Sequence, residues 1–457
     1  MEQIPQNSFR EPGETVADRP PPAPAAVSPA RPTPMRRVAT ASAVGTLIET
    51  YDFSLYGTAS ALVFPELFFP ALGEAGGTVA SFAAFGVAFV ARPFGSVLFG
   101  QLGDRWGRKK TLLLTLFLMG IGTVLVGALP TAQQIGMAAP VILVVLRVLQ
   151  GIAQGGEWAG AVLFSAEHAP KDTRGLWSVS ASFGGSFAIT LSNVTFLVTG
   201  LAMSDEAFLS WGWRLPFLAS VALIAVGAWM RLKVAETPVF TSETATSGVP
   251  RSPLRDALRS QPRELALATG AGVVVFALTL LGSSYLISYG TAHAGLSRST
   301  VLVTAMIGGL TLTAGNVTGA LWSDRVGRRR LLFGASLAAV VWSLVLFPVI
   351  DMGSVLSFGA GMVGTMFLAG LTTGPLGAFL SELFPTRYRY TATGLCYNIA
   401  GVLGGAIPPL VATSITAHRG SIMFGCFLAA LCAVSAGCVW AVKETRHRDL
   451  EKVLEAD

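Results

Sequence analysis

Charge is scarce in this sequence. Asp, Glu, Lys and Arg make up only 13% of the 457 residues, about half of the roughly 25% typical of soluble domains. A soluble protein of this length would need a polar surface over about two or three domains, so the shortage argues against a soluble fold. The net charge of +6 falls in short loops beside apolar runs. No basic stripe alternates with aromatic residues, so we expect no nucleic-acid partner.

Residues that bind metals or phosphate are also few or unsuitably spaced. Cys426, Cys432 and Cys438 fall at equal intervals in one apolar run, so they point in three directions around a helix and cannot share a metal ion. No glycine-rich loop followed by lysine is present to bind ATP, and no nucleophile–base pattern indicates an enzyme. We therefore expect neither a cofactor nor an enzymatic activity.

What the sequence does contain is apolar runs of about 20 residues, the length of helix that crosses a ~30 Å hydrocarbon core. Twelve runs follow Arg36-Arg37, over 38–65, 79–101, 111–129, 139–165, 175–201, 213–233, 264–291, 299–321, 331–349, 354–380, 389–415 and 420–441. We predict an all-α membrane protein with twelve transmembrane helices.

Basic residues alternate from loop to loop. One set of alternate loops carries almost all of them, from Arg36-Arg37 to the C-terminal Lys443, Arg446 and Arg448. The other set offers only Arg214, Arg298 and Arg419. Because basic loops stay in the cytoplasm, we expect both termini there.

The second half of the chain repeats landmarks of the first half in the same order. The segment 100–109 recurs at 320–329, Glu167-His-Ala-Pro recurs as Glu382-Leu-Phe-Pro, and Glu236-Thr237 recurs as Glu444-Thr445. Parallel six-helix repeats place a substrate site at their interface near the bilayer midplane. We divide the chain into a disordered Pro/Ala-rich cytoplasmic tail (1–35), a six-helix half (36–233), a cytoplasmic linker (234–262), a second six-helix half (263–442) and a cytoplasmic tail (443–457).

The sequence Gly-Gln-Leu-Gly-Asp-Arg-Trp-Gly-Arg-Lys at 100–109 resembles the signature of the major facilitator superfamily. Its copy at 320–329 is weaker, because Ala320 and Trp322 replace the first glycine and the leucine. Further segments resemble the metabolite:proton symporters of that superfamily: 49–57, 91–95, 147–157, 213–217, 236–240 and 382–390. The resemblance covers residues 38 to 447. It implies a monomeric carrier in a bacterial inner membrane that transports a small organic acid or zwitterion (dicarboxylate, citrate, shikimate, proline or betaine) with protons.

Ionisable residues inside spans cost roughly 2.5–3.5 kcal/mol each on translocon scales and are usually functional. Five lie well inside the first six predicted spans, namely Glu49, Asp52, Arg92, Arg147 and Glu157. None is expected deep in the last six. We therefore assign proton coupling to the first half.

Glu49, Asp52 and Tyr56 are spaced so that they share one helix face. Two close carboxylates in a partly dry site are suited to bind and release a proton near neutral pH. The resemblance implies an acidic residue in the first span opposite an arginine in the fourth, which Asp52 and Arg147 match. We predict that protonation of Asp52 frees Arg147 to hold a substrate carboxylate, with Glu49 as the second candidate. The alternative is a buried structural pair.

Four further residues are candidates for the substrate site. Arg92 is either a second anchor for an anionic substrate or a partner of Glu49 or Asp52. Tyr56, Tyr289 and Asn398 would complete the pocket, because buried phenol hydroxyls and amides need hydrogen-bond partners.

Gating residues are expected in the repeated loops. Asp104 can meet both Arg108 and a positive helix terminus and so latch the cytoplasmic side. Asp324 and Arg328 are their counterparts in the second half. Glu157 lies amid glycines that allow close helix approach and is predicted to be a gate or a packing partner.

These features predict a secondary active transporter that couples a small organic acid or zwitterion to the proton gradient by alternating access. A uniporter or exporter with the same topology is the first alternative, and a transporter-like nutrient sensor is the second. The expected partners are the substrate, protons and the lipid bilayer.

Overall fold

The computed structural model describes residues 35–106, 108–233, 253–385 and 388–446, and a few side chains within these ranges, among them 103–110, are not described. The chain divides into the units Met1–Pro34 and Met35–Asp457, and all described residues belong to the second unit. The predictions for the N-terminal tail, most of the linker and most of the C-terminal tail lie outside the described residues.

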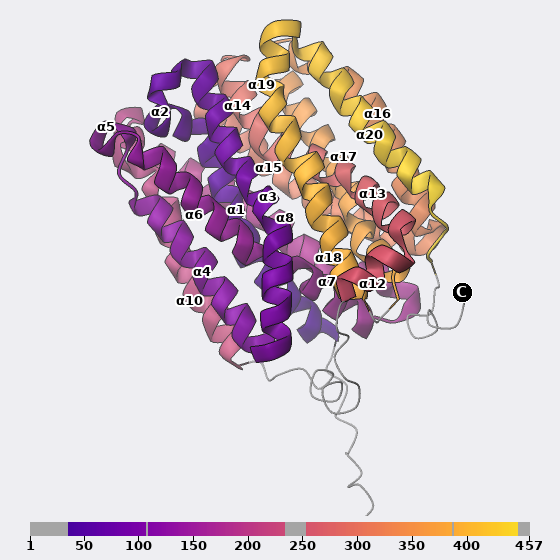
Figure 1. Ribbon diagram of the computed structural model, residues 1–457. Coiled ribbons are helices and arrows are strands. Elements are labelled where there is room, and N and C mark those ends of the chain that lie inside the picture. Colours follow the sequence, from indigo (N-terminus) through magenta and orange to yellow (C-terminus); the bar gives the residue numbers. More distant parts are fainter. Residues whose placement is uncertain (1–34, 107, 234–252, 386–387, 447–457) are drawn as a thin grey trace, which may run out of the picture. The chain divides into compact units, whose positions relative to one another are not determined.

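Helices account for nearly all of the described chain (Figure 1). The first half comprises α1 (Met35–Leu62), α2 (Phe64–Phe68), η1 (Pro70–Leu72), α3 (Gly73–Trp106), α4 (Arg108–Ala128), α5 (Ala132–Ile135), α6 (Ala138–Gln154), α7 (Glu157–His168), η2 (Lys171–Thr173), α8 (Arg174–Leu201), α9 (Asp205–Ala207), η3 (Phe208–Gly212) and α10 (Arg214–Lys233). The second half comprises α12 (Pro253–Ser260), α13 (Pro262–Leu280), η4 (Leu281–Tyr285), α14 (Leu286–Ala292), α15 (Arg298–Val326), α16 (Arg328–Ile350), α17 (Val355–Leu383), α18 (Arg389–Ala400), η5 (Gly401–Ala406), α19 (Ile407–Arg419) and α20 (Ser421–Ala441).

Each of the twelve predicted spans falls on helix. Within the described ranges, nine helices are long and apolar enough to cross a membrane, and the bent pair formed by Asp205–Gly212 and Arg214–Trp229 makes a tenth. The remaining two are α4, whose apolar stretch Leu113–Ala128 is shorter, and α1. Helix α1 is less apolar because it contains Glu49, Asp52 and a series of Ser and Thr residues.

The helices pair in the same way in both halves. In the first half α1 packs on α8, α3 on α6, and α4 on α10. The equivalent pairs in the second half are α13 with α18, α15 with α17, and α16 with α20. This correspondence is the structural form of the sequence repeat.

Two seams join the halves. Helix α8 packs along α15, and α3 packs along α18, η5 and α19. Helices α4, α10, α16 and α20 stay on the outside of this arrangement. The seams leave α1, α3, α6, α7 and α8 facing α13, α17 and α18 across the centre of the bundle.

Two of the central helices contain π-helical turns, η4 in the seventh span and η5 in the eleventh. Such turns insert a residue into the helix and are frequent at functional sites, because they redirect side chains and leave carbonyl groups out of the regular ladder. Both lie in the second half. Their counterparts in the first half, α1 and α8, are continuous helices.

Candidate substrate cavity

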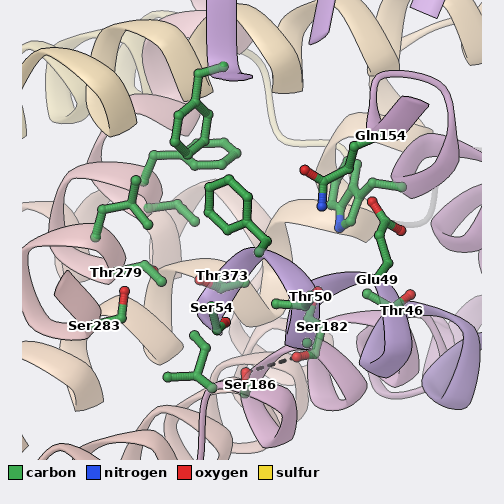
Figure 2. A pocket seen from close by; sticks show the side chains of 18 of the residues that line it. Thr46, Glu49, Thr50, Ser54, Gln154, Ser182, Ser186, Thr279, Ser283 and Thr373 are labelled. Carbon is green, nitrogen blue, oxygen red and sulfur yellow. Dashed lines mark hydrogen bonds between the residues drawn. The ribbon is translucent and has the colours of Figure 1, made fainter. Parts of the chain in front are cut away.

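A cavity of about 120 Å³ lies between the halves at the centre of the bundle. Its walls come from α1, α3, α6, α7 and α8 of the first half and from α13, η4, α15, α17 and α18 of the second. Figure 2 shows that Glu49 and Gln154 project from one side of this space and Thr279 and Ser283 from the other. The location agrees with the interface site expected for parallel repeats.

Only two of the residues that line the cavity are charged, Arg92 on α3 and Glu49 on α1. Both side chains are buried in the protein, with 6% of each residue exposed, and they interact electrostatically. Nη2 of Arg92 donates a short hydrogen bond to Oε1 of Gln154. Nε of Arg92 has no hydrogen-bond partner among the described residues. A carboxylate entering the cavity would therefore find one unused guanidinium donor.

Asp52 and Arg147 lie behind the cavity wall and do not line it. They are 2% and 1% exposed and interact electrostatically. No ion pair joins these two described residues, because both carboxylate oxygens of Asp52, and Nε and Nη2 of Arg147, lack hydrogen-bond partners. The prediction that they approach each other is thus met only in part. Their roles stay predictions.

Phe53 separates the two arginines. The Cζ atom of Arg92 lies 4.5 Å from the centre of the Phe53 ring, and that of Arg147 lies 4.6 Å from it. Arg92 also lies over Phe89, and Arg147 over Tyr56 and Phe85. Cation–π contacts of this kind stabilise a desolvated guanidinium by about 2 kcal/mol. They help to hold two arginines in the dry centre of the bundle, beside the electrostatic interactions with Glu49 and Asp52.

A chain of hydrogen bonds leads from Arg147 away from the cavity. Nη1 of Arg147 donates to Oε1 of Gln150 at 3.4 Å, and Nε2 of Gln150 donates to the Thr123 hydroxyl at 2.8 Å. This chain connects α6 to α4. It gives Nη1 of Arg147 a hydrogen-bond partner, although the cavity lies on the far side of Phe53.

The three predicted substrate ligands other than the arginines occupy different places. Asn398 lines the cavity, and its Nδ2 donates to the Gly155 carbonyl at 2.8 Å, where α6 ends. Tyr56 does not line it, and its buried hydroxyl has no hydrogen-bond partner in the part of the chain that the structure describes. Tyr289 also lies off the cavity wall, because its hydroxyl donates to Oδ1 of Asp351 at 2.5 Å. In this conformation the structure does not bring Tyr56 or Tyr289 to the substrate space.

The family model described as Major Facilitator Superfamily matches residues 43–409. The chain belongs to this superfamily. Its members transport small molecules across membranes, so the protein is a transporter and not an enzyme, with the twelve-helix, two-half fold of the superfamily.

Several bacterial transport proteins are similar to this chain. The inner membrane metabolite transport protein YhjE of Escherichia coli K12 is 36% identical over 91% of this chain and 95% of its own length. The shikimate transporter of the same strain is 35% identical over 87% and 94%. The proline/betaine transporter is 30% identical over 91% and 85%.

The fold also matches solved structures. A crystal structure of a D-xylose–proton symporter aligns with a TM-score of 0.74 at 17% identity, over 91% of this chain and 99% of that one. The same symporter bound to 6-bromo-6-deoxy-D-glucose aligns with a TM-score of 0.71 over 91% and 98%. At this identity the likeness shows the fold alone.

At the predicted cytoplasmic end of the transporter, where α1 begins and α20 ends, Asp324 links the halves. Its two carboxylate oxygens accept hydrogen bonds from the backbone amides of Gly175 and Leu176, each at 3.0 Å. These amides belong to the first turn of α8, where backbone donors lack intrahelical partners and the helix dipole favours negative charge. Nη1 of Arg328 bonds the same carboxylate at 2.5 Å. The predicted contact of an acidic loop residue with an arginine and a helix terminus is thus present in the second-half copy.

The first-half copy cannot be compared, because the side chains of Asp104 and Arg108 are outside the described set. Glu157 is buried with 7% exposed and begins α7, but it does not line the cavity. Its predicted gating role stays a prediction.

Sequence reasoning missed Glu382. It falls in the last turn of α17, inside the helix and not beyond it, and it is fully buried. It lies two residues beyond the predicted span 354–380, at the end of α17 and not deep within the span. The repeat of Glu167 by Glu382 in the sequence was the available signal. Arg174, Phe53 and Gln154 were also missed, because each acts through neighbours on other helices.

Proposed function

We propose that the protein is a proton symporter that takes up a small organic acid or zwitterion. The observation that carries this proposal is the pair formed by Arg92 and Glu49, one cation and one carboxylate on the wall of an otherwise uncharged cavity. The cavity lies at the interface of the two halves, where alternating access operates in transporters built from repeats.

Arg92 is the proposed anchor for the substrate carboxylate. Its Nε–H is buried and has no hydrogen-bond partner among the described residues, and leaving such a donor unsatisfied costs about 1–3 kcal/mol. A carboxylate accepting from it would restore the lost hydrogen bond and add a charge-assisted contact. The relatives named as transporters of shikimate and of proline or betaine all carry substrates with a carboxylate.

Glu49 and Asp52 are the proposed proton carriers, and each has a different role. Glu49 shares the cavity with Arg92, so its carboxylate competes with the substrate for the same guanidinium. A proton on Glu49 removes that competition, which links proton loading to substrate loading. Asp52 lies one helical turn further along α1, near Arg147, and its protonation would release Arg147 on the far side of Phe53.

The proposed orientation places both termini in the cytoplasm. The basic loops support it, because positive residues remain on that side. The charged contacts of Asp324 and Glu382 would then form the cytoplasmic gate. The relative named as an inner membrane protein supports the same membrane for this chain.

Uptake by proteoliposomes tests the proposal. With an acidic outside buffer, a panel of carboxylates and betaines should include at least one compound that accumulates against its gradient, and dissipating the pH gradient should stop accumulation. Glu49→Gln and Asp52→Asn should each abolish accumulation driven by the gradient while exchange of internal for external substrate persists. The matched control is Glu74→Gln, an exposed carboxylate in the first turn of α3. If pH-driven accumulation survived in both variants, the proton assignment would be wrong.

A further inference from the structure

The size of the cavity limits the substrate. It offers about 120 Å³, several times the roughly 10–15 Å³ that one water-sized group needs, so it has room for a small solute. A compact solute with a single ring or a short chain fills it.

The charges on the wall limit the substrate to one carboxylate. Arg92 is the only cationic residue among those that line the cavity, and Glu49 is the only anionic one. A second carboxylate would enter a low-dielectric space with no cation to meet it and with Glu49 nearby. Burying an unpaired charge in this way is strongly unfavourable.

The aromatic residues around the cavity are not arranged to hold a quaternary ammonium group. Such cages need open aromatic faces around the cation. Here Trp158 and Tyr397 stack on each other with ring centres 3.4 Å apart and planes 6° from parallel. Phe53 and Phe89 already carry the Arg92 guanidinium. These four rings are therefore already engaged with protein groups, which disfavours an ammonium cage built from them.

Many of the hydroxyl groups on the cavity wall have no hydrogen-bond partner among the described residues. Seven serine and threonine hydroxyls of the wall make no hydrogen bond with any described residue: those of Thr46, Thr50, Ser54, Ser182, Thr279, Ser283 and Ser284. Serine and threonine in helices usually bond a carbonyl of the preceding turn, as Ser186 does at 2.8 Å and Thr373 does at 2.7 Å. The hydroxyls that make no such bond are available to a solute.

Six of these hydroxyls lie in two groups, and that of Ser182 lies apart on α8. Thr50 and Ser54 are one turn apart on α1, following Thr46 on the same face. Thr279, Ser283 and Ser284 lie where α13 passes into the π-helical turn η4. Figure 2 shows Thr279 and Ser283 on the side of the cavity opposite Glu49 and Gln154. A solute held by Arg92 would point its other end toward them.

We infer that the substrate is a hydroxylated monocarboxylate, with its carboxylate on Arg92 and its hydroxyls on the α1 and η4 groups. This inference rests on the proposed function, because it assigns the chemistry of the same cavity. Thr279 and Ser283 determine specificity by exchanging hydrogen bonds with the hydroxyls of the solute. Dicarboxylates and methylated ammonium zwitterions are the classes that it excludes.

Equilibrium binding to the purified, full-length protein in detergent tests the inference independently of any gradient. Two matched pairs serve as probes: quinate with cyclohexanecarboxylate, and glycerate with propionate. Glycine betaine and succinate represent the excluded classes. We expect at least one hydroxylated acid to bind at least tenfold more tightly than its deoxy partner and than betaine and succinate. Equal binding within both pairs, tightest binding of betaine or succinate, or no binding of either hydroxylated acid would overturn the inference.

The residues involved are tested by Thr279→Val combined with Ser283→Ala. Two lost hydrogen bonds of about 1 kcal/mol each should weaken binding of the hydroxylated acid by roughly tenfold or more. Binding of its deoxy partner should stay unchanged, which also shows that the variant is folded. Thr313→Val is the control, because that hydroxyl bonds the Gly309 carbonyl at 3.0 Å and does not line the cavity. An equal loss for both members of the pair would contradict the assignment.

Proteoliposome uptake separates failure of the inference from failure of the proposed function. Accumulation of betaine or succinate under a pH gradient, without binding of hydroxylated acids, would retain proton symport and overturn the substrate class. Binding of a hydroxylated acid without any pH-driven accumulation would retain the substrate class and overturn proton symport.

Discussion

Arg174 and Glu382, from opposite halves, meet at the predicted cytoplasmic end, where Nη1 of Arg174 donates to Oε1 of Glu382 at 3.2 Å. The side chains are 4% and 0% exposed. Arg328 approaches the same oxygen at 3.5 Å, and the Thr445 hydroxyl donates to the other oxygen at 3.0 Å. Glu382 therefore balances two buried guanidinium groups, and its removal would leave both without their shared carboxylate.

The first prediction concerns Glu382→Gln. Breaking a buried ion pair by removing one partner typically costs about 3–5 kcal/mol, so the variant should unfold at a clearly lower temperature in detergent. Cysteines introduced near the predicted cytoplasmic end should also become easier to label. Glu444→Gln is the control, since Glu444 is exposed and mainly accepts backbone hydrogen bonds such as that from Arg328 at 2.9 Å. Similar losses of thermal stability in the two variants would show that the buried ion pairs of Glu382 contribute no more than the exposed contacts of Glu444.

The second prediction concerns Asp324→Asn. The amide side chain keeps one acceptor oxygen for the amides of α8 but loses the charge that attracts Arg328 and the helix terminus. We expect turnover to fall at least severalfold while substrate affinity changes by less than about twofold, because the residue lies at the end of the bundle. Asp104→Asn should behave alike if the first-half loop makes the same contact. Loss of affinity with normal turnover would contradict a gating role.

The helices were predictable from the sequence, and the neighbours of each side chain were not. Runs of apolar residues of fixed length report the bilayer thickness directly, which is why all twelve ranges fall on helix. Spacing along α1 correctly puts Glu49 and Asp52 close together, but it does not say which one faces the centre. That depends on how α1 sits against α3 and α6, whose packing no local pattern encodes. The same holds for Phe53, which lies between two arginines from separate helices.

The third prediction separates Arg92 from Arg147. Arg92→Gln removes the only cation on the cavity wall, so substrate binding should weaken by at least a hundredfold, consistent with a hydrogen-bonded charge pair of about 3 kcal/mol or more. Arg147→Gln should weaken binding far less and should abolish pH-driven accumulation. Direct binding in detergent and uptake by proteoliposomes measure the two effects. If Arg147→Gln lost binding as fully as Arg92→Gln, Arg147 would have to reach the substrate in another conformation.

The fourth prediction concerns the opposite end of the bundle, where Arg298 forms a short ion pair with Asp205. Asp205 is 87% exposed, so the pair should contribute no more than about 1 kcal/mol, screened by salt. Arg298 also lies 4.1 Å from the centre of the Phe208 ring. Asp205→Asn should therefore change the thermal stability little, and Arg298→Ala should lower it more, because it loses the cation–π contact too. Equal losses of thermal stability in the two variants that vanish in high salt would show that the ion pair contributes more than the cation–π contact.

The last prediction uses two adjacent glycines at the end of α6. A Cβ on Gly155 would lie 2.0 Å from the carbonyl oxygen of Arg92, whereas a Cβ on Gly156 would meet nothing closer than 3.7 Å. Gly155→Ala must push α6 away from α3 at the residue that carries the cavity cation. It should destabilise the protein by about 1–3 kcal/mol, as overpacking does, and weaken substrate binding through displacement of Arg92. Gly156→Ala should leave both properties near those of the unmodified protein. Thermal unfolding and equilibrium binding of the two variants measure this, and equal behaviour would mean that the contact between α3 and α6 is not tight enough to position Arg92.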